Sequence, residues 1–278
     1  MDLRPRYREW APPPALRGVV RCVWVRVVGA AGVPVLPDAC SDLIWQAGRG
    51  AFVAGPDTGL APTGASPGTI YVGVRFGPGT GGPALGLPLS ELRDRRVALA
   101  DLSRRLDERL PADLEPAEAV GRLLEAAAAE PDAAIVEAAR RLDDPGARVE
   151  GLATDLGLSE RQLRRRCHAA AGYGPKTLHR VLRFRRFLAA PGGDLARVAL
   201  DAGYADQSHL THECARLSGL TPAILRAARG WWRASPSRPR PTTAIWGASR
   251  SGSRRVSPTS PGSAPARACS TSAAARGP

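Results

Sequence analysis

Histidine is absent from this 278-residue chain before residue 168. A metal bound by a protein usually needs several imidazole, thiolate or carboxylate ligands gathered together, so the front part of the chain is not expected to hold one. The five cysteines are scattered and show no C-x-x-C spacing, which favours reduced, unbridged thiols. The composition therefore predicts neither a metal site nor a disulfide framework.

Several sequence motifs are missing as well. No G-x-S-x-G elbow, phosphate-binding loop or dinucleotide fingerprint occurs, so we expect no catalytic residues, no enzyme activity and no cofactor. No apolar run reaches the roughly 18 residues that a membrane-spanning helix needs. The first ten residues are charged and lack the apolar core of a secretion signal. We expect a cytoplasmic, nucleoid-associated protein without a membrane partner.

Acidic residues are absent from residues 231–278, which hold 8 Arg. Residues 146–230 hold 14 basic and 7 acidic residues, whereas residues 1–145 hold 17 Arg and 19 acidic residues, for a net charge of +13 over the whole chain. A basic back half indicates a polyanionic partner, and double-stranded DNA is the partner we expect. Residues 231–278 are too poor in apolar side chains to form a core and are predicted to be a disordered basic tail.

Residues 1–88 are rich in glycine, proline and β-forming residues. Short strands are predicted at residues 21–28, 42–46, 51–54 and 69–76, separated by turn signals, and a glycine-rich loop is predicted at 75–88. This pattern is typical of a small β-barrel or sandwich and favours a sensor domain.

Residues 89–142 change character, with Leu, Ala and Val at helical intervals among Arg and Glu. We predict amphipathic helices over 90–110 and 115–142, broken at Pro111 and near Pro131. They have three possible roles: packing on the β-domain, dimerisation, or linking to the next domain. Residues 143–146 form the predicted linker to an all-helical domain at 147–230.

The helical domain contains the same pattern twice. In the first copy, residues 149–168, an apolar stripe leads to Gly157, Ser159 and Gln162 form a capping-box pattern, and Leu163 is the core anchor. In the second copy, residues 196–216, Gly203 makes the turn, Asp206 is the expected N-cap and Leu210 the anchor. Two helix-turn-helix patterns in one basic domain are far more specific than one.

A helix over residues 175–189 is predicted to join the two copies, with its arginines and Lys176 on a solvated outer face. Around the two anchors, polar side chains are expected to project outward. Such a surface suits the major groove, where Arg reads guanine through O6 and N7. The predicted DNA-binding residues are Arg161, Gln162, Arg164, Arg165, Lys176, Gln207, Ser208, His209, Thr211 and His212.

The segments GLSERQLRRRC, GYGPKTLHRVLRFRRF and GYADQSHL followed by GLTPAILR resemble the DNA-binding domain of AraC-type (AraC/XylS) transcriptional regulators over about 80 residues. The resemblance implies that the second helix of each copy enters one of two successive major-groove turns, and that Lys176 contacts phosphate. Cys167 and Cys214 stand where Phe is usual in that family, and His212 stands where Arg is common.

The front part, around residues 36–44, 54–58 and 73–79, is similar to a cupin-like sensor domain attached to such regulators. The fold class expected is therefore α+β and multidomain, a cupin-like β-domain with flanking helices followed by an all-α domain with two helix-turn-helix motifs. The candidate ligand-binding residues are Asp38, Asp42, Trp45, Arg75 and Phe76.

Three hypotheses remain open from the sequence. The first is a sequence-specific DNA-binding transcription regulator, modulated by a small-molecule effector or by homodimerisation and, if an activator, contacting RNA polymerase. The second is a small-molecule-binding β-domain protein, with or without enzymatic activity, that carries accessory nucleic-acid-binding helices. The third is a non-specific basic architectural protein.

Overall fold

The computed structural model describes residues 6–29, 34–62 and 64–228. All of them belong to one unit, Met1–Thr242, and the predicted basic tail lies outside the described residues. The strands are β1 (Arg6–Trp10), β2 (Val20–Val27), β3 (Ser41–Gln46), β4 (Gly50–Ala54), β5 (Ile70–Phe76) and β6 (Arg96–Ala98). Two 3-10 turns, η1 (Pro14–Leu16) and η2 (Leu89–Glu91), accompany them.

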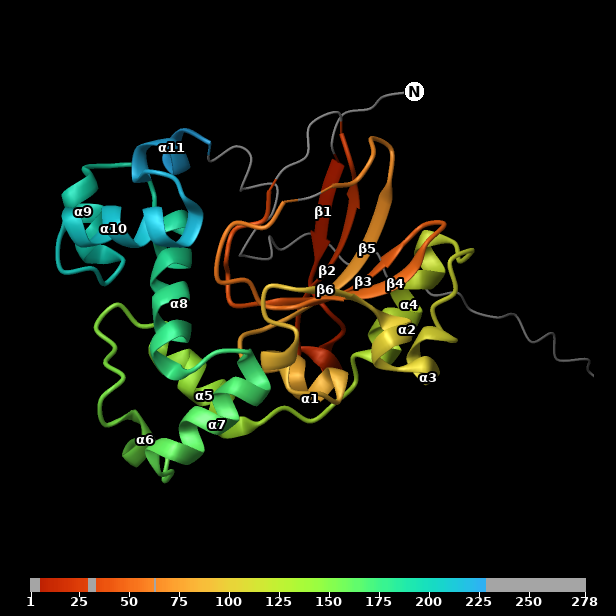
Figure 1. The fold of residues 1–278 in the computed structure, drawn as a ribbon, viewed down its shortest axis with the longest axis horizontal. Helices are drawn as coiled ribbons and strands as arrows, with labels where there is room; N and C mark the ends of the chain where they lie inside the picture. Colours follow the sequence, from red (N-terminus) through yellow and green to blue (C-terminus); the bar gives the residue numbers. More distant parts are fainter. Residues whose placement is uncertain (1–5, 30–33, 63, 229–278) are drawn as a thin grey trace, which may run out of the picture. The chain divides into compact units, whose positions relative to one another are not determined.

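The six strands form one antiparallel sheet in the order β1-β2-β5-β3-β4-β6 (Figure 1). The four predicted strands correspond to β2, β3, β4 and β5 within a residue or so at each end. Among the described strands no pairing joins β1 to β6, so the sheet is open. The β-rich N-terminal part predicted from the turn spacing is confirmed, with two edge strands in addition.

The helices are α1 (Gly81–Leu85), α2 (Leu99–Leu102), α3 (Arg104–Asp107), α4 (Pro116–Ala126), α5 (Ala133–Leu142), α6 (Leu152–Asp155), α7 (Glu160–Ala171), α8 (Pro175–Ala189), α9 (Leu195–Asp201), α10 (Gln207–Ser218) and α11 (Pro222–Ala227). Figure 1 shows α8 running from the α5–α7 group to the α9–α11 group. The all-helical C-terminal part predicted from the sequence is confirmed.

The prediction of one helix over residues 90–110 is wrong. This segment forms η2, strand β6 and the short helices α2 and α3. Its leucines recur at helical intervals, but they are buried separately: Leu92 just after η2, Leu99 at the start of α2 and Leu110 in the turn after α3. Asp94 has a φ of 59°, a left-handed conformation that breaks the chain before β6. The predicted loop over residues 75–88 likewise contains α1.

One face of the sheet carries the core of the β-part. Val23, Leu43, Val53 and Val74 pack there with leucines from α1, α2 and α4. A second core lies among α5 to α11, and α5 supplies Ile135 to it. The amphipathic segment expected between the two domains is therefore divided: α4 packs on the sheet and α5 packs with the helical part.

Candidate nucleic-acid interface

The first helix-turn-helix consists of α6 and α7. Gly157 has a φ of 66°, which a glycine adopts without strain, and it turns the chain after α6. The predicted capping box is present. The backbone N–H of Gln162 donates to Ser159 Oγ at 3.2 Å, and the backbone N–H of Ser159 donates to Gln162 Oε1 at 2.8 Å. The side-chain oxygen of Gln162 therefore serves the helix start, although Gln162 stays exposed at the outer surface.

The two sides of α7 differ sharply in exposure. Leu163 is 3% exposed and is part of the helical core. Arg161, Arg164 and Arg165 are exposed, and no hydrogen bond or ion pair to them occurs within the described part of the chain. Arg166, by contrast, pairs with Asp132 at the start of α5. Three guanidinium groups without a partner among the described residues thus project from one side of α7.

The second helix-turn-helix consists of α9 and α10. Gly203 has a φ of 88° and makes the turn, as predicted. Asp206 is the N-cap of α10, and its Oδ1 accepts a hydrogen bond from the His209 amide at 2.7 Å. Such a cap is worth about 1 kcal/mol of helix stability. Leu210 is fully buried, so both anchors predicted from the sequence face the core.

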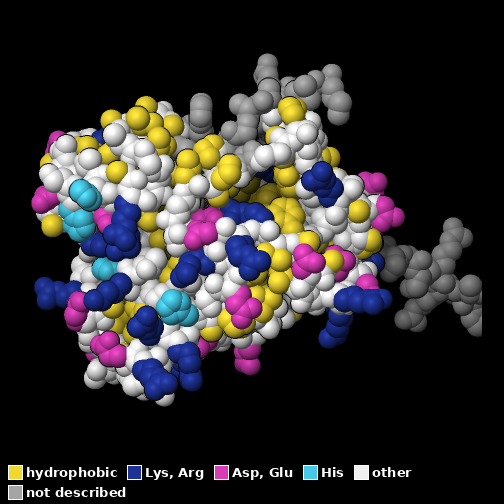
Figure 2. All heavy atoms as spheres, viewed as in Figure 1, with side chains coloured by type: hydrophobic (Ala, Val, Ile, Leu, Met, Phe, Trp, Pro, Cys, Tyr) yellow, Lys and Arg dark blue, Asp and Glu magenta, His cyan; other side chains and the backbone are white. Residues whose placement is uncertain are grey.

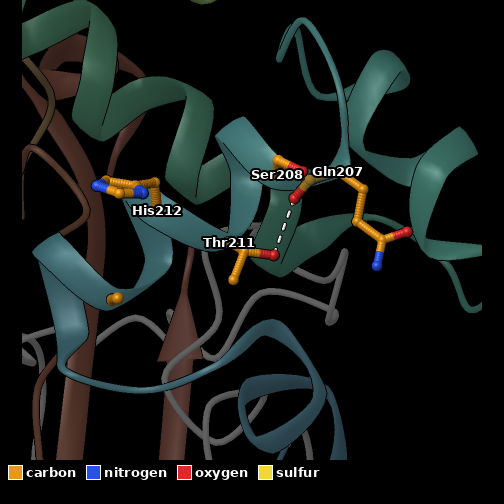
Figure 3. Close-up of a pocket in the computed structure, with 5 residues that line it drawn as sticks. Gln207, Ser208, Thr211 and His212 are labelled. Atoms are coloured by element: carbon orange, nitrogen blue, oxygen red, sulfur yellow. Dashed lines mark hydrogen bonds between the residues drawn. The ribbon is translucent and has the colours of Figure 1, made fainter.

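Four of the predicted side chains of α10 line an open hollow of about 550 Å³, together with Ala215: Gln207, Ser208, Thr211 and His212. Figure 3 shows them projecting from one helix, with Gln207 and His212 pointing away from each other. Thr211 Oγ1 donates to the Gln207 carbonyl at 2.8 Å. The hollow is a feature of an exposed helix surface, and its donors and acceptors are accessible to a large partner.

His209 is placed differently from the other predicted residues of α10. Its ring packs edge-on against Tyr204, with centroids 5.3 Å apart, and its Nδ1 accepts a hydrogen bond from the Ala205 amide at 3.4 Å. The side chain is half-buried. His209 thus fastens the turn to α10 with one edge of its imidazole.

The joining helix α8 has the predicted bounds but not the predicted solvated arginine face. Lys176 lies near its start and is exposed, as predicted, whereas Arg185 is 8% exposed. Arg180 pairs with Glu213 of α10 at 2.8 Å. Figure 2 shows Lys, Arg and His side chains over the helical part of the molecule. Periodicity alone missed these inward arginines, because a long side chain on the flank of a helix can reach a buried partner.

Cys167 and Cys214 are both fully buried in the helical core. Burial raises the pKa of each thiol to about 12, so both are protonated at neutral pH. They pack as small apolar side chains at the positions where the resemblance led us to expect Phe. Within the described residues no group of His, Cys, Asp and Glu is arranged to hold a metal ion.

The candidate ligand-binding residues of the β-part divide between the two faces of the sheet. Asp42 and Arg75 pair on one face, with Arg75 Nε 3.0 Å from Asp42 Oδ1, and Asp38 Oδ2 lies 3.6 Å from the Arg75 guanidinium. Trp45 and Phe76 are fully buried in the core on the opposite face, where the Trp45 indole donates to the Pro111 carbonyl at 2.8 Å. The five residues therefore do not form one site.

Two neighbours of this ion pair were not anticipated. Trp24 donates its indole N–H to Asp42 Oδ1 at 2.7 Å, and the Tyr7 ring stacks on Trp24 with centroids 6.0 Å apart. Burial by itself lowers the pKa of Arg75, but the carboxylates of Asp42 and Asp38 outweigh it and raise that pKa well above its usual value. Arg75 is therefore a charged, satisfied group within the sheet.

The described helices include none that combines the length and apolar character needed to cross a bilayer. Residues 8–98 match a family described as a domain of unknown function, DUF6597, and residues 152–228 match a family described as a helix-turn-helix domain. The second match covers both helix-turn-helix copies and α11.

The HTH-type transcriptional regulator VirS of Mycobacterium tuberculosis, found in two strains, is 36% identical to this chain over 99 residues. The match covers 34% of this chain and 29% of VirS. An apo structure of a ToxT variant from Vibrio cholerae shares 10% identity at a TM-score of 0.39, covering 80% of this chain and 96% of that one. The likeness to ToxT is too low to support a conclusion.

The resemblance drawn from the sequence motifs is thus confirmed over residues 152–228, where the family match and the capped, twin helix-turn-helix geometry coincide. The C-terminal part of this chain is a helix-turn-helix domain of the AraC type, and it follows a domain of unknown function.

Proposed function

We propose that this chain is a sequence-specific DNA-binding transcription regulator that reads two neighbouring major-groove segments with α7 and α10. It acts by binding rather than by catalysis, in the cytoplasm at the nucleoid. The chain spans less than a third of the length of the curated relatives it matches, so this function is inferred from the helical domain and the groups it presents.

The observation that carries the proposal is the exposed arginine surface of α7. Arg161, Arg164 and Arg165 are exposed without a partner in the described part of the chain, while Leu163 between them is buried. Arg is the side chain best suited to guanine and to phosphate, because its planar fork makes two parallel hydrogen bonds. The donors of these three guanidinium groups are therefore free to bind DNA.

The second helix presents a different chemistry. Gln207 offers an amide that matches adenine in the major groove, and Ser208, Thr211 and His212 offer hydroxyl and imidazole groups. We therefore expect α7 to supply most of the electrostatic attraction and α10 to contribute mainly to sequence preference. Two such helices on one chain predict protection of about 20 base pairs, as two half-sites about 10 base pairs apart.

The test is a selection of bound duplexes from a random pool with the full chain, followed by titration of the selected and a scrambled duplex with salt. Specific binding keeps a preference of about 10³-fold or more for the selected duplex while both affinities fall with salt. Equal affinity for the two duplexes at every salt concentration would reduce the chain to a non-specific basic protein.

A second role, binding of a small-molecule effector by the β-part, is favoured by the buried Asp42–Arg75 pair beside Trp24 and Tyr7. Buried charges of this kind are costly unless they serve a structure or a ligand. The full chain should be screened for ligands by the shift of its thermal unfolding midpoint. Ligands that raise the midpoint of the wild type, but not of Arg75→Met, would identify this site.

Homodimerisation and, for an activator, contact with RNA polymerase are also part of the proposal. The oligomeric state is read from sedimentation of the full chain with and without the selected duplex. A monomer that still protects both half-sites would exclude dimerisation as a requirement for binding.

A further inference from the structure

The second half of α8 carries three arginines that turn toward the second helix-turn-helix and the end of α5: Arg183, Arg185 and Arg186. Asp143 follows α5 directly, and its Oδ2 accepts a hydrogen bond from Arg185 at 2.6 Å. Its Oδ1 accepts a longer one from Arg186 at 3.3 Å. In the described part of the chain, Asp143 is the only carboxylate that pairs with either arginine.

Two of these arginines, Arg183 and Arg186, hold the turn of the second helix-turn-helix. Arg186 Nε donates to the Ala202 carbonyl at 3.2 Å, and Arg183 donates to the Gly203 carbonyl at 3.3 Å. A side chain at residue 203 would place its Cβ 2.6 Å from the Pro145 carbonyl oxygen, so the turn also fits tightly against the linker. The turn is therefore fixed in part by Arg186, whose charge Asp143 balances.

From this turn, contacts continue into α10, the recognition helix of the second helix-turn-helix. The guanidinium of Arg183 lies over the Tyr204 ring, 5.4 Å from its centroid, and Tyr204 packs edge-on against His209. His209 belongs to the first turn of α10. A shift of Arg183 or Arg186 would consequently be passed to the start of α10 through packed side chains.

The recognition helix of the first helix-turn-helix, α7, is held in place by different contacts. A Cβ at residue 82 of α1 would lie 2.3 Å from the Ala169 carbonyl oxygen of α7, and Tyr173 donates its hydroxyl to the Asp57 carbonyl at 2.9 Å. These contacts are close backbone packing and one neutral hydrogen bond, and the Arg166–Asp132 ion pair to the start of α5 adds to them. They do not involve Asp143.

We propose that Asp143 is a positioning residue for α10, which it sets in place by neutralising and aligning Arg186. This inference rests on the proposed DNA-binding function. A chain with two DNA-reading helices binds two half-sites much more tightly than one helix binds one half-site, but only if the geometry lets both helices bind at the same time. Loss of the Asp143 carboxylate therefore removes α10 from its half-site and leaves α7 on the other.

The first measurement is a hydroxyl-radical footprint on the duplex selected by the wild type. Asp143→Asn is compared with Asp144→Asn, a matched control because Asp144 is an exposed neighbour whose carboxylate accepts only from the Gly146 amide, at 2.8 Å, among the described residues. Arg165→Ala and Gln207→Ala assign the two half-sites to α7 and α10.

We expect Asp143→Asn to lose protection of the α10 half-site while it keeps protection of the α7 half-site. Its affinity for the selected duplex should fall at least tenfold. Asp143→Glu, which keeps the carboxylate, should retain part of the protection and of the affinity. Asp144→Asn should bind like the wild type. Equal loss over both half-sites, or no loss, would overturn the positioning role.

The second measurement needs no DNA and separates this inference from the proposed function. In Asp143→Asn, the amides of Gly203 and Tyr204, which donate to the Leu200 and Ala199 carbonyls, should exchange hydrogen at least tenfold faster. Exchange in α7 should stay as in the wild type. If the chain selects no duplex, the proposed function fails while this result still decides the role of Asp143. Unchanged exchange at the turn, or an equal rise in α7, overturns the inference.

Discussion

Removal of the Arg165 side chain tests the assignment of α7 most directly. Arg165 is exposed on α7, two residues before the buried Cys167, and forms no hydrogen bond or ion pair with the described residues. Arg and Ala have similar helix propensities, and surface substitutions without a partner usually change stability by less than about 0.5 kcal/mol. Arg165→Ala should therefore leave the fold intact.

The cost should fall on DNA binding. A two-pronged contact from Arg to guanine is worth about 1–3 kcal/mol, which corresponds to a loss of about 5- to 150-fold in affinity for the selected duplex. The variant should also accept other bases at one position of the site. A phosphate contact would instead weaken binding to all duplexes alike and lower the salt slope by about 1.

The assay measures dissociation constants for the selected duplex and for its single-base variants at two salt concentrations. Arg104→Ala is the control, because Arg104 has a 91% exposed side chain on α3 and its removal takes away the same charge. Equal affinity and equal base preference for Arg165→Ala and the wild type would refute the place of Arg165 in the reading surface.

Three further predictions concern other parts of the molecule. Lys176→Ala should weaken binding to all duplexes equally and reduce the slope of log affinity against log salt by about 1; an unchanged slope in a salt titration would argue against a phosphate contact. Burial beside two arginines of α8 lowers the pKa of His179 to about 4. Between pH 6.5 and about 4, His179 therefore binds a proton in the unfolded chain but not in the folded chain. The free energy of unfolding should fall by about 2–3 kcal/mol as the pH drops from 7 to 4.5, and His179→Leu should lack this part of the fall in urea titrations; an identical fall in the variant would contradict the assignment. Gly82→Ala should cost about 1–3 kcal/mol in thermal unfolding, because its Cβ would lie 2.3 Å from the Ala169 carbonyl oxygen. Gly121→Ala on α4 should stabilise the chain by about 0.5–1 kcal/mol, because no atom of the described residues lies within 4 Å of the added Cβ. A Gly82→Ala protein as stable as this control would disprove the close approach of α1 to α7.

The local features of the helical domain were predictable from the sequence. Ser159 with Gln162, and Asp206 ahead of α10, form the predicted caps, and Gly157 and Gly203 adopt the predicted left-handed turns. Each of these features depends on hydrogen bonds or backbone angles within about four residues, so the residue types alone specify it.

Part of the β-domain could have been predicted better. Side chains alternate between the faces of a strand, so Arg75 and Phe76, adjacent in β5, had to point to opposite faces. Asp42 and Trp45, three residues apart in β3, are separated in the same way. Period-two alternation along the strands is enough to divide the five candidate ligand-binding residues between the two faces of the sheet.

What the sequence by itself determined is the pair of capped helix-turn-helix units, their buried anchors and the exposed polar side chains around them. Only the tertiary structure decided that Asp42 lies opposite Arg75, that α5 joins the helical core, and that Arg185 and Arg186 turn inward to Asp143. The physical reason is sequence separation: caps and turns are closed by neighbouring residues, whereas these pairs join segments tens of residues apart, whose meeting depends on how the whole chain packs.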